Sequence, residues 1–338
     1  MTNKIRKQFS GKNPNKGIIP FFIIVFNILV IMFPQPIVEA ARNGVILWLN
    51  NVLPALLPFV FGVNILLGLG VINFFGRVLS PAMKRLFNVP GAGGFAVAVG
   101  FTSGYPMGAK VVSDLRLQKK ITKVEAERLI SFCNNSGPLF VLGAVGTGMF
   151  GNVRIGQFLL VVHYISAIIT GILFKYYKTE DVIRESNTNH NNSISSVSNF
   201  GKLFTESVVQ SIQTMLIIGG FIIIFSVILE LIKIMGLHYY LGNTFDGLID
   251  PYILHGTIFG IIEVTNGVNY LATQTQGGIS SILAAASVIS FGGLSIHGQS
   301  LSFISKTDIS VKIYFLGKII HSAIALCIGW GLYSLFFH

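Results

Sequence analysis

Long apolar segments alternate along the chain with short polar ones. Runs of roughly twenty mostly apolar residues, the helical length that spans about 30 Å of hydrocarbon, predict membrane crossings. These runs lie near 18–33, 45–72, 129–150, 153–174, 207–235, 279–304 and 311–335. Glycine and polar residues interrupt two further apolar stretches, 91–112 and 251–275. Non-helical backbone at membrane depth is tolerated only beside protein or a water-filled cavity, so each stretch is predicted to be a re-entrant hairpin.

Each interrupted stretch has a polar companion further along the chain. Gly100–Gly108 is followed by Ser131–Pro138, Gly260–Gly267 is followed by Ser290–Gln299, and both companions begin with Ser-Phe. Paired discontinuous helices of this kind surround the midplane site of inverted-repeat transporters. The pattern predicts an all-α polytopic membrane protein, an inverted repeat with two re-entrant helical hairpins and broken transmembrane helices. Alternatively, the small residues at both places only permit close helix packing.

Composition supports a membrane protein. Of the 338 residues, 52% are hydrophobic and 11% charged, too few charges to cover a soluble globule of this length. The formal net charge is +11, but the basic residues sit beside apolar spans and do not interleave with aromatic residues on a polar face. The expected partner is therefore the lipid bilayer and not nucleic acid.

The distribution of basic residues predicts the orientation. Residues 1–17 contain lysine and arginine but no acid, which places the N-terminus in the cytoplasm under the positive-inside rule. Following the crossings from there, the first hairpin enters from the cytoplasm and the second from outside, as an inverted topology requires. The Val38–Ala41 segment leaves one ambiguity, because it resembles a signal-peptide cleavage site as well as the end of a retained anchor.

Four regions follow from this arrangement. They are a cytoplasmic basic tail (1–17), a first half with the first hairpin (18–174), a flexible cytoplasmic linker (175–205) and a second half with the second hairpin (206–338). Residues 186–199 of the linker hold almost nothing that could be buried.

The interrupted segments carry the candidate substrate-binding residues. Half-helix N-termini favour carboxylates, and hydroxyl, amide and imidazole groups could add hydrogen bonds to a small planar anion. The candidates are Thr102, Ser103, Gly104, Tyr105, Asn134, Asn135, Ser136, Glu263, Thr265, Asn266, Ser295, His297 and Gln299.

Several of these residues have a structural alternative. An acid in an apolar stretch usually faces a cavity or a partner, so Glu263 is expected to contact substrate, a cation or a proton. Lys110 either contacts substrate or extends to cytoplasmic headgroups. His297 is a ligand contact or a packing residue, and packing is expected for His163 and His321.

An intramembrane enzyme is the rival class. The segment Gly100–Gly104 superficially resembles a membrane serine protease motif, but the spacing is wrong and no second signature follows. Cysteine and histidine show no metal-ligand spacing, and Cys133 and Cys327 both lie in apolar spans. We therefore predict no catalytic residue, metal or cofactor, although Na+ or a proton could serve as a coupling ion.

Three segments together carry a family resemblance. Ala40–Phe59, Thr102–Lys110 and Ser290–Gln299 resemble the YlbJ-type sporulation integral membrane proteins of endospore-forming bacteria, within the nucleoside-recognition Gate group. The resemblance covers about residues 20–335. A weaker similarity extends to concentrative nucleoside transporters, in which two helical hairpins and two broken helices enclose the substrate; Ile121–Ser131 and Ser290–Ile296 fall at the expected broken helices.

The resemblance implies a function. YlbJ-type proteins are implicated in moving dipicolinic acid from the mother cell across the outer forespore membrane. Nucleoside carriers grip ribose with acidic residues at the hairpin tips, whereas here the first tip has none and the second has Glu263. A nucleoside or other small-metabolite carrier and a non-transporting membrane scaffold in spore assembly are the alternatives. Direction of transport and a homo-oligomeric state stay open.

Overall fold

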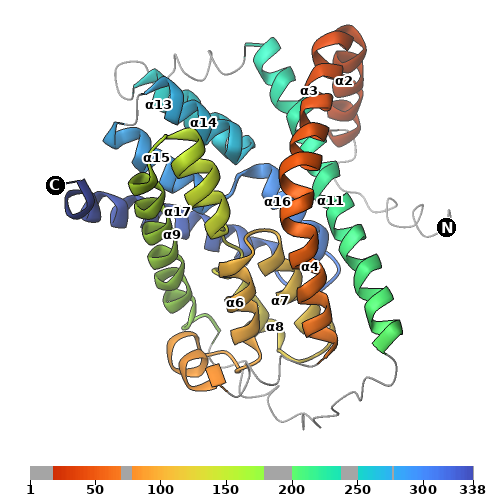
Figure 1. The fold of residues 1–338 in the computed structure, drawn as a ribbon, viewed down its shortest axis with the longest axis vertical. Coiled ribbons are helices and arrows are strands. Elements are labelled where there is room, and N and C mark those ends of the chain that lie inside the picture. Colours follow the sequence, from red (N-terminus) through yellow and green to blue (C-terminus); the bar gives the residue numbers. More distant parts are fainter. Residues whose placement is uncertain (1–17, 70–77, 179–199, 237–249, 276–277, 338) are drawn as a thin grey trace.

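The computed structural model describes residues 18–69, 78–178, 200–236, 250–275 and 278–337, and every regular element among them is a helix (Figure 1). The prediction of an all-α chain is confirmed. Four helices are long and apolar enough to cross a membrane: Val153–Phe174, Phe200–Ile234, Ile279–Ile304 and Val311–Phe337. The bent pair Pro20–Met32 and Pro34–Asn50 makes five if it counts as one span. The basic tail and residues 186–199 lie outside the described residues.

The first helices pack along a helix from the middle of the chain. They are α2 (Ile18–Met32), α3 (Pro34–Leu47), the π-helix η2 (Trp48–Val52) and α4 (Leu53–Gly68), and their partner is α11 (Phe200–Ile234). Both α3 and α4 run beside α11 (Figure 1). A Cβ atom at Gly219 would lie 2.6 Å from the Trp48 ring, so this approach requires glycine. We call these five elements the α11 group.

The remaining helices form the hairpin group, which begins with η3 (Met83–Phe87), α6 (Gly93–Thr102) and α7 (Met107–Leu117). Next come α8 (Lys123–Ile130), η4 (Leu139–Met149) and α9 (Val153–Phe174). Helices α6 and α7 pack against each other as a hairpin within the predicted stretch 91–112 and run on to Leu117.

The prediction of one continuous crossing over 129–150 is wrong. Helix α8 ends at Ile130, residues 131–138 are unwound, and η4 begins at Leu139. Pro138 lacks a backbone donor, and the Asn135 amide bonds the Phe132 carbonyl at 2.8 Å instead of leaving it to the helix. The polar run Asn134–Pro138 therefore interrupts the helix.

The second half of the hairpin group repeats the order of the first. Its elements are α13 (Pro251–Ile262), α14 (Val264–Gln274), α15 (Ile279–Phe291), α16 (Gly293–Ile304) and α17 (Val311–Phe337). The order in both halves is hairpin, interrupted helix, long helix. Gly292 interrupts the α15–α16 helix at φ +98°, a left-handed conformation that favours glycine.

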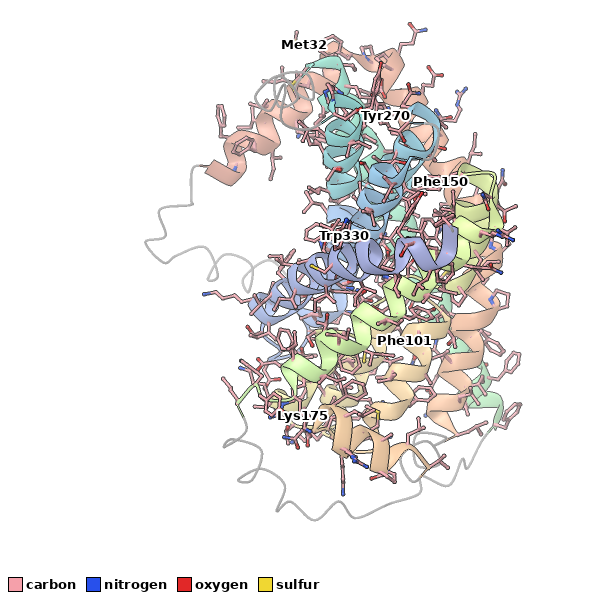
Figure 2. All side chains as sticks on the ribbon, turned by 90° about the vertical axis from the view of Figure 1, so that its left-hand side faces the viewer. Met32, Phe101, Phe150, Lys175, Tyr270 and Trp330 are labelled. Atoms are coloured by element: carbon pink, nitrogen blue, oxygen red, sulfur yellow. The ribbon has the colours of Figure 1, made fainter. Side chains whose placement is uncertain are left out.

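The two hairpins lie toward opposite ends of the molecule. Helices α6 and α7 occupy the lower half of Figure 1, and α13 and α14 lie at its upper end. In Figure 2, Tyr270 on α14 lies toward the end marked by Met32, and Lys175 lies at the other end. The long helices α9 and α17 pack together between them. Large apolar side chains such as Trp330, 74% exposed, cover the outside of α17, as a lipid-facing surface requires.

Candidate functional site

The tip of the first hairpin rests on the unwound segment 131–138. Residues 103–106 connect α6 to α7, and Gly104 adopts φ +84° there. A Cβ atom on Gly104 would lie 2.7 Å from the Gly137 nitrogen, so a side chain would separate the tip from the unwound segment. Tyr105 extends from the same tip to the second half, where its hydroxyl donates to the Ile289 carbonyl at 3.0 Å.

The tip of the second hairpin rests on the interruption between α15 and α16. Glu263 is the single residue between α13 and α14. A Cβ atom on Gly293 would lie 2.9 Å from the Gly260 carbonyl and 3.1 Å from the Val264 nitrogen. Each interrupted helix therefore holds the hairpin tip of its own half.

A cavity of about 580 Å³ lies between the two tips, within the usual size range of small-molecule sites. Side chains of α11, including Ile218 and Ile222, close one side of it, and η4 contributes apolar residues such as Phe140. We call it the central cavity. Nine of the residues predicted from sequence line it: Thr102, Ser103, Gly104, Tyr105, Ser136, Glu263, Thr265, Ser295 and Gln299.

The central cavity offers hydrogen-bond donors that other protein groups leave free. Helices α7, η4 and α16 begin beside it. Asn134 Oδ1 accepts from the Ala109 nitrogen in the first turn of α7 at 3.3 Å, whereas the N-cap residues of η4 and α16 make no side-chain cap. The hydroxyls of Ser103 and Ser136 are buried and have no partner among the described residues. Ser136 is fully buried and lines the cavity. Free backbone N–H groups at helix N-termini, together with hydroxyl donors, suit an anionic ligand.

Glu263 acts as the N-cap of α14. Its carboxylate accepts from the backbone nitrogens of Thr265 at 3.2 Å and Asn266 at 2.8 Å, and from the Asn266 amide at 2.8 Å. An N-cap carboxylate satisfies first-turn donors and favours the positive end of the helix dipole. The residue lines the central cavity, and these three bonds use three of the roughly four acceptor sites of its carboxylate.

Lys318 is the residue that sequence reasoning missed. It lies in α17, is fully buried and donates from Nζ to the backbone carbonyl of Asn134 in the unwound segment. Its Nζ also lies 5.8 Å from the centre of the Tyr105 ring, and no described carboxylate forms an ion pair with it. The available signal was a second lysine, after Lys312, inside the predicted crossing 311–335.

The other predicted residues lie behind the cavity wall. The Asn134 amide bonds the Ser300 hydroxyl at 2.8 Å and the Tyr314 hydroxyl at 3.3 Å, and Tyr314 also contacts His297 Nδ1 at 2.9 Å. Asn135 bonds within its own segment, and Asn266 bonds Glu263. These four residues, Asn134, Asn135, Asn266 and His297, support the wall and do not line the cavity.

Two histidines connect the halves. His163 Nε2 accepts from the Ser136 backbone at 2.9 Å, which leaves Nδ1 as the donor to the Ser290 hydroxyl at 2.9 Å. The His321 Nε2 contacts the His163 carbonyl at 3.0 Å. Both side chains are fully buried, as packing residues are. Among the described residues, Ser103 Oγ has no hydrogen-bond partner.

Lys110 lies outside the central cavity. Its ammonium bonds Asn64 at 3.0 Å and Asp114 at 2.8 Å, and the residue is only 6% exposed. This position, 6% exposed and paired within the protein, does not match the headgroup contact expected for Lys110, and the substrate contact stays a prediction.

The geometry defines a class: a polytopic helical membrane protein with two hairpin tips around a central cavity. A family model described as nucleoside recognition (Gate) matches residues 49–153, which include the first hairpin and its unwound partner. The sporulation integral membrane protein YlbJ of Bacillus subtilis (strain 168) is 33% identical over 330 residues, which cover 92% of this chain and 81% of that protein. The chain belongs to the YlbJ family of sporulation integral membrane proteins. No solved structure matches it.

Proposed function

We propose that the protein transports a small organic anion, most specifically dipicolinate, across the outer forespore membrane during sporulation. The observation that carries this proposal is Lys318, a fully buried lysine without a described acidic partner, beside the central cavity. A charge inside a membrane protein is costly unless it is paired. An anion bound against Tyr105 would supply the missing counter-charge, while the uncapped helix N-termini and the hydroxyls of Ser103 and Ser136 would hold its carboxylates.

Alternating access fits the arrangement of the two helix groups. The central cavity is bounded by hairpin tips from both halves and by α11. The hairpins lie toward opposite ends, which is the relation expected of an inverted repeat with a cytoplasmic N-terminus (Figure 1). In this mechanism the hairpin group moves against the α11 group, and access to the cavity changes sides.

The position of Lys318 also bears on which coupling ion the proposed transport could use. Carbonyl and hydroxyl groups at residues 134–136 are of the kind that could coordinate Na+. The Lys318 ammonium donates to the Asn134 carbonyl, and a positive charge at that place opposes a second cation. A proton or passive transport is therefore favoured over Na+.

A nucleoside is the second candidate substrate, since the matching family model is described as nucleoside recognition. Its polar hydroxyl groups would need acceptors at the hairpin tips. The carboxylate at the tips is that of Glu263, which caps α14. An anion therefore fits the free donors of this cavity better than a ribose does.

The test is uptake of radiolabelled dipicolinate by proteoliposomes that contain the purified protein, with excess uridine as competitor. Saturable uptake that uridine leaves unchanged supports the anion carrier. Uptake that uridine blocks indicates a nucleoside carrier. Protein that binds and transports neither solute is the result expected of a membrane scaffold or an unrelated function. Empty liposomes and the Ser136→Ala variant, which removes one cavity hydroxyl, are the controls for leak and for specific binding.

A further inference from the structure

A second cavity, of about 410 Å³, lies between the α11 group and the hairpin group. Helix α4 contributes Asn64, α7 contributes Lys110 and Asp114, and α11 contributes Thr214. Lys306, which follows α16, and Glu206, whose side chain is 55% exposed, mark its outer edge. Leu117 and Gln118 also line it, next to the basic residues Arg116, Lys119, Lys120 and Lys123 where α7 connects to α8; we call this end of the molecule the basic side.

The walls of this second cavity are polar and in part buried. Lys110 Nζ bonds Asn64 Oδ1 at 3.0 Å, and the Asn64 amide bonds the Ser211 hydroxyl at 2.9 Å. Ser113 is 2% exposed, lines the cavity, and its hydroxyl has no partner among the described residues. Polar groups at such positions in membrane proteins face a bundle interior or a water-filled cavity. The second cavity is therefore suited to water and to polar solutes.

Both cavities lie along the same three chain segments. On α11, Ile222 and Ile218 line the central cavity and Thr214 lines the second. On α16, Gln299 lines the central cavity and Phe303 the second. The third segment runs from the first hairpin tip into α7, with Tyr105 at the central cavity and Lys110 at the second. The cavities are thus consecutive spaces along one seam.

Along two of these segments, a methionine falls between the residues that line one cavity and the residues that line the other. Met107 precedes Lys110 on α7, and Met215 follows Thr214 on α11. Their exposed fractions are 0% and 1%, and both belong to one buried apolar cluster that includes Ile218. Methionine side chains are unbranched and flexible, so they can close a gap between helices and also move out of it.

We infer that the second cavity is the vestibule through which substrate passes between the basic side of the membrane and the central cavity, and that Met107 and Met215 form the seal between them. This inference rests on the proposed transport function for the identity of the solute, but the water-accessible path can be measured without any substrate.

The first experiment maps the vestibule with a thiol reagent. Ser113→Cys is introduced into a Cys327→Ser background, where the remaining Cys133 is fully buried. An anionic methanethiosulfonate is added to inside-out membrane vesicles, which present the basic side. We expect modification of Ser113→Cys at least roughly tenfold faster than modification of Ile212→Cys, because only thiols that reach water ionise and react. Ile212 lies on α11, is 46% exposed and lines neither cavity.

The second experiment tests the seal. Ser136→Cys places a thiol in the central cavity, and Met215→Ala shortens one sealing side chain. We expect Met215→Ala to accelerate modification of Ser136→Cys from the basic side. Equal rates with and without Met215→Ala would overturn the seal, and slow modification of Ser113→Cys would overturn the vestibule.

The transport assay tests whether the vestibule lies on the path of the transported substrate. When wild-type protein takes up dipicolinate, a bulky adduct on Ser113→Cys is expected to stop uptake, and unchanged uptake would refute the pathway. When wild-type protein transports neither dipicolinate nor uridine, the proposed function fails, while the labelling result still decides whether the vestibule exists.

Discussion

Replacing Lys318 with methionine should separate transport from stability. A lysine at the centre of a membrane helix costs about 2.5–3.5 kcal/mol on insertion scales. Its removal leaves the Asn134 carbonyl without its donor, at a cost of about 1–3 kcal/mol. These effects oppose each other and nearly cancel. The Lys318→Met fold is therefore expected to match the wild type within about 1 kcal/mol.

Removal of the Lys318 charge should weaken the binding of an anion in the central cavity. Coulomb's law with an effective dielectric constant of about 20 gives about 3 kcal/mol for unit charges 5.8 Å apart, the distance from Nζ to the Tyr105 ring centre. Tyr105 lines the cavity and Lys318 does not, so a bound carboxylate lies further away. The expected interaction is then about 2 kcal/mol, or about thirtyfold in affinity.

The assay measures dipicolinate uptake against concentration for wild type, Lys318→Met and Lys312→Met. Lys312 lies on the same helix but is exposed, so its variant is the matched control for charge. We expect the half-saturating concentration to rise about thirtyfold for Lys318→Met and to stay unchanged for Lys312→Met. Thermal unfolding in detergent checks the fold. If Lys318→Met has the same half-saturating concentration as the wild type, an electrostatic role of Lys318 is refuted. If Lys318→Met does not fold, the role of Lys318 is structural.

Three further predictions address the hairpin tips and the basic loops. Glu263→Gln weakens the cap of α14, so we expect a stability loss of about 1 kcal/mol in thermal unfolding with uptake retained; abolished uptake in a stable variant would contradict the capping role. Gly104→Ala should abolish uptake because of its φ of +84° and the 2.7 Å contact with Gly137, whereas Gly220→Ala, with open space around it, should be tolerated. The hydrogen bond from Arg116 lowers the pKa of Asp308. This ion pair is therefore expected to stabilise the fold by about 0–1 kcal/mol above roughly pH 4, and the stabilisation is lost as the pH falls and Asp308 becomes protonated. Unfolding measured against pH should lose this dependence in Asp308→Asn.

The helix–tip–helix form of the two interrupted stretches was predictable because it depends on local chemistry, while their re-entrant course through a membrane stays a prediction. A cluster of glycine and polar residues inside an apolar stretch favours a break in the helix beside protein or a cavity, and both stretches have helices on either side of a tip. The interruption at Gly292 follows from the same signal. The continuous crossing over 129–150 failed because apolar content was averaged across the polar run Asn134–Pro138, which ends the helix.

The site was harder to predict where it depends on distant contacts. Lys318 appears in sequence as one of two lysines in an apolar helix, and its partner Asn134 is 184 residues away. Asn134 and His297 carry suitable chemistry, but Ser300 and Tyr314 bind them behind the wall. For Glu263, the sequence showed an acid in an apolar stretch, while its role depends on the end of α13 at Ile262, which fixes where the next helix begins.

The pairing of α3 and α4 with α11 has a consequence for biogenesis. The ribosome delivers α2 to α4 first, yet the helix that covers them begins only at Phe200, after the whole first half of the hairpin group has been made. Trp48, which packs against Gly219, must wait for that helix in the bilayer. The nascent chain therefore holds its first helices without their partner until synthesis has passed Phe200, and a chain that stops after α9 is expected to be a substrate for membrane proteases.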